Sequence, residues 1–151
     1  MDRDLAAIAQ ERMDRFFERY EQDHPYAICL LKSHLLAEEL LEEIIASVCK
    51  NPDTAREARM SFFSKLKLAE AIDGTDTQMW NCIENLNAAR NELAHGRDMA
   101  HLERKIDKLV ESVRRSYTKV TFAGDRGRDL EMAVIVLNGA LSRTAVEYVG
   151  G

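Results

Sequence analysis

Apolar residues recur every three or four positions along most of this 151-residue chain, and this spacing constrains its fold more than any other feature. It is clearest over residues 98–119. In a helix wound at about 100° per residue, one side of that stretch carries Met99, Leu102, Ile106, Leu109, Val110, Val113 and Tyr117. Prolines, which interrupt helices, occur only at positions 25 and 52. The pattern therefore predicts an all-α protein.

The same spacing predicts further helices along the chain. Breaks at residues 23–25, 51–53, 73–74 and 124–127 separate them. Thr75 and Gln78 have the spacing of a capping box, and Gly96 stands where helices usually end. The predicted helices cover residues 3–22, 25–50, 60–72, 75–95, 98–119 and 129–148. We expect a bundle of five or six helices that forms a single helical domain over residues 1–151, because no repeat or linker divides it.

Two of these helices carry more apolar residues than one core needs. The apolar stripe of the helix over residues 25–50 consists of Leu30, Ala37, Leu41, Ile44, Ile45 and Val48. Four more leucines flank this stripe, at Leu31, Leu35, Leu36 and Leu40. The last helix has apolar residues outside its stripe at Met132, Ile135 and Val136. Excess apolar surface usually marks a second interface, so we expect a homodimer.

Composition excludes several classes of protein. No run of eighteen apolar residues is present, so no membrane span is expected, and the charged N-terminus is not typical of a signal peptide. Cys29, Cys49 and Cys82 lack CxxC spacing and are expected as reduced thiols in a cytoplasmic protein. The net charge of −5 argues against a general nucleic-acid binder.

The charge is nevertheless uneven, since residues 97–128 hold nine bases and five acids. Basic side chains follow the side of the 98–119 helix opposite its apolar stripe, at Arg104, Lys105, Lys108, Arg115 and Lys119. This basic stripe is the one candidate for steering RNA. The alternative is an ordinary solvated helix face, because Glu103, Asp107 and Glu111 are interleaved at its edge.

The segment LNAARNELAHG, residues 86–96, contains the candidate functional residues. Arg90 falls within the apolar face formed by Met79, Ile83, Leu86, Leu93 and Ala94. A buried guanidinium without a partner costs several kcal/mol. Arg90 is therefore expected either to reach an acidic partner, most plausibly Glu38, or to face a place where an anion binds.

Asn91 and His95 share a helix face because they lie four residues apart. Histidine titrates near neutrality and serves as an acid or base, and arginine supplies a permanent cation with a geometry that suits phosphate. His24, His34, His95 and His101 lack the spacing of metal ligands, so neither a metal nor a cofactor is expected. On the apolar stripe of its helix, His34 is more simply explained as a hydrogen-bonded core residue than as a ligand.

The Arg-Asn-x-x-x-His pattern at Arg90, Asn91 and His95 resembles the signature of the HEPN superfamily. The order of a long helix, a short Phe-x-x-Lys-Leu-x-Leu-Ala helix, a turn and this motif over residues 26–96 resembles mannitol-operon-repressor-like HEPN proteins. The first resemblance implies a metal-independent endoribonuclease whose motifs meet at a dimer cleft, with an antitoxin partner if it is a toxin. The second implies a non-catalytic transcriptional regulator or interaction module.

The helix geometry raises a question for the catalytic hypothesis. In an ideal helix Arg90 and His95 point about 140° apart. They would converge on one phosphate through the length of the arginine side chain, through a distorted last turn, or through a second protomer.

Overall fold

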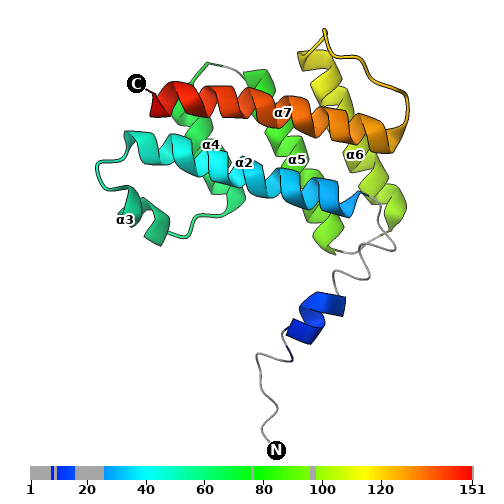
Figure 1. Ribbon diagram of the computed structural model, residues 1–151, viewed down its shortest axis with the longest axis horizontal. Helices are drawn as coiled ribbons and strands as arrows, with labels where there is room; N and C mark the ends of the chain where they lie inside the picture. Colours follow the sequence, from blue (N-terminus) through cyan, green and yellow to red (C-terminus); the bar gives the residue numbers. More distant parts are fainter. Residues whose placement is uncertain (1–7, 9, 16–25, 76, 96–97, 151) are drawn as a thin grey trace, which may run out of the picture.

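The computed structural model describes residues 8, 10–15, 26–75, 77–95 and 98–150, and the fold is an all-α bundle (Figure 1). Residues 10–15 are helical and precede the other helices, and the described residues contain no strand. The other helices are α2 (Ala27–Val48), α3 (Pro52–Glu57), α4 (Phe62–Asp73), α5 (Thr77–His95), α6 (Met99–Ser116) and α7 (Arg126–Val149).

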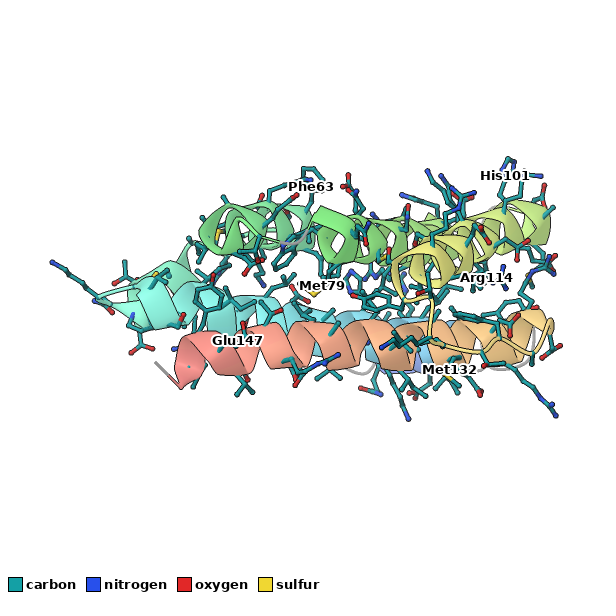
Figure 2. All side chains as sticks on the ribbon, turned by 90° about the horizontal axis from the view of Figure 1, so that it is seen from above. Phe63, Met79, His101, Arg114, Met132 and Glu147 are labelled. Atoms are coloured by element: carbon teal, nitrogen blue, oxygen red, sulfur yellow. The ribbon has the colours of Figure 1, made fainter. Side chains whose placement is uncertain are left out.

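The long helices form two layers, which Figure 2 shows edge on. Helices α2 and α7 lie side by side in one layer and run in the same direction, and α4, α5 and α6 form the other (Figures 1 and 2). Helix α5 crosses α2 and ends beyond it, on the side away from α7 (Figure 1). The crossing exposes the end of α5, which carries the Arg-Asn-x-x-x-His motif.

The core fills the space between the layers. The predicted stripes of α2, α5, α6 and α7 supply most of it, and burial of these side chains is the main contribution to stability. The largest fully buried side chains are Trp80, Leu30, Leu41, Ile44, Leu66, Met79, Ile83, Leu86, Ile106, Leu109, Leu130 and Leu137.

Several predicted stripe residues are exposed instead. Val48 is 53% exposed and Met13 50% exposed. Ala94 is also exposed, although it shares a helix face with buried residues of α5. Val48 and Ala94 lie at the C-terminal ends of α2 and α5, where a helix extends past its neighbours. Most of the predicted helix over residues 3–22 lies outside the described residues.

Capping side chains explain where the helices begin. Asn51 accepts a hydrogen bond from the Thr54 amide and Pro52 occupies the first turn, so the segment expected as a break forms α3. Asp98 caps α6 and Asp125 caps α7, which therefore begins at Arg126 rather than at residue 129. Helix α5 is described from Thr77, two residues after the predicted start, and the Thr75 hydroxyl donates to Asp73.

Candidate functional site

Arg90 lies half-buried on α5, at the edge of the core formed by Met79, Ile83, Leu86 and Leu93. Its Nη1 is 3.5 Å from Asn91 Oδ1, a long hydrogen bond. Among the described residues no carboxylate forms an ion pair with Arg90. Its positive charge is therefore not neutralised within the described part of the chain.

Glu38, the expected partner of Arg90, is paired with Lys65 of α4 instead. Lys65 Nζ donates to Glu38 Oε1 over 2.8 Å and to Glu42 Oε1 over 2.6 Å, and the lysine side chain is only 13% exposed. These bonds raise the pKa of Lys65, although burial acts in the opposite direction. Lys65 was not singled out from the sequence because nothing in a Lys-Leu-Lys-Leu segment shows which lysine faces α2.

His34 of α2 lies beside Arg90 and is 8% exposed. Its Nε2 is 3.0 Å from Asn87 Oδ1, and its ring stacks on Phe62 with centroids 3.9 Å apart. Because Asn87 Oδ1 can only accept, Nε2 carries the proton of the neutral ring. His34 is the hydrogen-bonded core histidine that the apolar stripe predicts.

The pKa of His34 is lowered, mainly by burial and further by the positive charge of Arg90. The hydrogen bond to Asn87 and the charge of Glu38 act against this shift without cancelling it. The neighbours of Arg90 thus include a neutral imidazole and an amide. These neighbours of Arg90 were not identified from the sequence, although Asn87 and Arg90 lie three residues apart, on one side of α5.

Asn91 and His95 are both exposed on the last turns of α5. The helix is regular through His95, so the last turn is not distorted to bring His95 toward Arg90. Within one chain Arg90 faces α2, and His95 points to solvent at the end of the helix. Only two of the three routes to convergence remain, the length of the arginine side chain or a second protomer.

Four residues of the basic stripe, Arg104, Lys105, Lys108 and Arg115, lie on the side of α6 away from the α2–α7 layer. Lys119 does not, because α6 ends at Ser116 rather than at residue 119 and Lys119 falls in the turn that follows. His101, at the start of α6, projects away from the α2–α7 layer (Figure 2), and its Nδ1 is 2.6 Å from Arg104 Nη2. Arg115 pairs with Glu111 over 3.0 Å. Arg104, Lys105, Lys108 and Lys119 form no ion pair with a described carboxylate.

The acids interleaved at the edge of the stripe are already occupied. Arg126 of α7 binds Glu103 over 2.9 Å and Asp107 over 2.7 Å, and it lowers the pKa of Asp107. Glu111 binds both Arg114 and Arg115. A cation from outside the stripe thus neutralises Glu103 and Asp107, whereas Glu111 neutralises Arg115, one of the stripe's own residues.

A buried carboxylate oxygen lies close to the motif in sequence. Glu92 Oε1 is shielded from solvent and has no hydrogen-bond partner among the described residues. No pattern in the sequence singles out this residue.

Comparison with known proteins identifies no relative: no family model, curated protein or solved structure matches the chain. Among the described residues, no three histidine, cysteine, aspartate or glutamate side chains are grouped to hold a metal ion. None of the described helices is both long and apolar enough to cross a membrane.

Proposed function

We propose that this protein is a HEPN-like, metal-independent endoribonuclease that uses Arg90, Asn91 and His95 and acts as a homodimer. The observation that carries the proposal is the position of Arg90. It lies near the C-terminal end of α5 without a carboxylate partner among the described residues, because Lys65 holds Glu38, the acid expected to neutralise it. A half-buried guanidinium that has no described carboxylate partner and lies against the exposed Asn91 suits an incoming phosphate.

The proposed reaction uses the substrate's own 2′-hydroxyl as nucleophile. Its oxygen bonds to the adjacent phosphorus as its proton passes to a histidine base, and the bond from phosphorus to the 5′ oxygen breaks. His95 protonates the leaving 5′ oxygen, and Arg90 stabilises the charge that develops on the phosphate. The products are a 2′,3′-cyclic phosphate and a 5′-hydroxyl. His95 of a second copy would supply the base.

The basic stripe would guide RNA to this site. Arg104 and Lys108 lie one turn apart on α6, about 6 Å along the helix axis. This spacing is comparable to that of successive phosphates in an extended strand. Neither cation pairs with a described carboxylate, so both charges are available to phosphate, and Arg104 Nη2 also lies 2.6 Å from His101 Nδ1. The overall negative charge of the protein would restrict binding to this side.

The test is cleavage of single-stranded RNA in excess chelator. We expect products with 2′,3′-cyclic phosphate ends, no cleavage by His95→Ala, and no cleavage of a DNA copy, which lacks the nucleophile. Glu57→Ala is the control, because Glu57 is exposed on α3, outside both the motif and the basic stripe. It should retain cleavage.

Two outcomes would contradict the proposal. Cleavage that persists in His95→Ala would indicate a contaminating nuclease. No cleavage of several RNAs by folded, dimeric wild-type protein, with no antitoxin co-purified, would favour the non-catalytic regulator, in which Arg90, Asn91 and His95 only tie helices together.

A further inference from the structure

Phe63 is the one aromatic ring among the large apolar side chains that are exposed in the described part of the chain, and it is 48% exposed. Its neighbour Phe62 is buried. Figure 2 shows Phe63 on the side of the α4–α6 layer that faces away from α2 and α7, where His101 also lies. The motif belongs to α5 of the same layer, so an exposed ring here can contact the same ligand as the motif.

The register of α4 against α5 follows from three contacts between them. Each contact joins an earlier residue of α4 to a later residue of α5, so the two helices are antiparallel. The contacts are Asp73 with Trp80 at 3.2 Å, Lys67 with Glu84 at 3.2 Å, and Phe62 with Asn87 through His34. Phe63 precedes Lys67 by four residues and therefore lies at the level of Ala88, four residues after Glu84. Asn91 is then about 4–5 Å further along the helix axis and His95 about 10 Å.

The basic stripe lies at the same level on the other side of α5. Helix α5 is the middle helix of the layer, because α4 and α6 do not contact each other in the described structure. Helices α5 and α6 are antiparallel (Figure 1), and Cys82 Sγ is 3.6 Å from Ser116 Oγ. Eight residues after Cys82 is Arg90, and eight residues before Ser116 is Lys108. Phe63, Arg90 and Lys108 thus form a row across the three helices.

From this row we infer that Phe63 stacks on an unpaired base, and that the substrate is a single strand crossing the layer from the basic stripe, over Asn91 and His95, to Phe63. The inference rests on the proposed function and adds the class of RNA and a residue that binds it. Adjacent helices lie about 8–10 Å apart, which one or two nucleotides of an extended strand span. The bases of a duplex stack on each other and offer no free face to a ring.

The surroundings of the ring support a stacking contact rather than a phosphate contact. Lys67 Nζ lies over the Phe63 ring, 5.6 Å from its centroid. Glu70 and Glu84 hold this ammonium at 3.0 Å and 3.2 Å and raise the pKa of Lys67. The lysine therefore covers one face of the ring with a charge that is already neutralised. The strand would gain its phosphate contacts at α6 and its stacking contact at Phe63.

RNA binding by the full chain tests Phe63 separately from cleavage. Labelled single-stranded 2′-O-methyl RNA lacks the free nucleophile, so its Kd reports binding alone. Phe63→Ala should weaken binding about 5- to 100-fold, the usual loss when a stacking ring is removed. Phe63→Leu, apolar but without a ring, should lose nearly as much, and Phe63→Trp should retain binding. Leu68→Ala is the control, since Leu68 is 39% exposed on another side of α4, and it should bind like wild type.

Salt dependence separates the ring from the stripe. Stacking releases no counterions, so Phe63→Ala should leave the slope of log Kd against log salt unchanged. Lys108→Ala should make that slope shallower, because one phosphate contact is lost. A duplex of the same sequence should bind wild type and Phe63→Ala equally.

The outcomes distinguish this inference from the proposed function. Phe63→Ala and Phe63→Leu that bind single-stranded RNA as tightly as wild type would overturn the inference, and cleavage by wild type would then leave the endoribonuclease standing without this contact. An equal loss of duplex binding by Phe63→Ala would also overturn it. Binding that depends on the ring, without cleavage by wild type, would support the contact and contradict the nuclease. A wild type that neither binds nor cuts single-stranded RNA would overturn both.

Discussion

Lys65 and Arg90 are two partly buried cations on the same helix layer, and their surroundings differ in one respect. Lys65 holds two carboxylates of α2, whereas Arg90 has no carboxylate among the described residues. Removing a cation is costly when it leaves buried carboxylates unpaired, and much cheaper when it leaves none. The difference separates a side chain that stabilises the fold from one that is available to a ligand.

We therefore predict that Arg90→Leu lowers the free energy of unfolding by less than about 1 kcal/mol. Lys65→Leu, the matched control, should lower it by about 1–3 kcal/mol, because Glu38 and Glu42 lose their shared donor. Chemical denaturation of the three proteins measures both values. A loss for Arg90→Leu as large as that for Lys65→Leu would mean that Arg90 has a structural role.

At the scale of elements, contacts between side chains of different helices are the feature that the sequence predicts least well. Apolar periodicity located five of the six helices α2 to α7, because burial of a stripe depends on residues within the helix itself. Helix α3 was missed because it buries no side chain and depends on its Asn51 cap and Pro52 instead. Spacing along a chain does not show which cation of α4 or α5 reaches Glu38. The partners of Glu38 and Arg90 could therefore be identified only from the way the helices pack.

The contact of His34 with Asn87 and Phe62 joins α2, α5 and α4 and should make stability depend on pH. Burial lowers the pKa of His34 in the folded state, so the unfolded state binds the proton more readily. Its contribution is therefore complete above the unfolded pKa of about 6.5 and declines as the pH falls below it. His34→Gln should reduce the loss of stability between pH 7 and pH 5 relative to wild type.

Thermal melts across that range measure this dependence, with His101→Ala as the control at an exposed histidine. The control should follow the wild-type curve. If His34→Gln loses as much stability as wild type between pH 7 and pH 5, then His34 is not the group that titrates.

At the scale of the whole molecule, the proposed reaction makes activity depend on assembly. Arg90 and His95 point about 140° apart on a helix that is regular to its end, so one chain presents them to different places. The proposed reaction therefore needs a second copy whose α5 end lies beside the first, where it would supply a second histidine and a second guanidinium.

The consequence is that RNA cleavage should follow the fraction of dimer. Across a dilution series in which wild type passes from dimer to monomer, cleavage per chain should fall in proportion to the lost dimer. Sedimentation and RNA cleavage measured on the same samples compare the two. A monomer that cleaves at the same rate per chain as the dimer would show that one chain holds a complete site, and Arg90 would then have to reach the phosphate bound by its own His95.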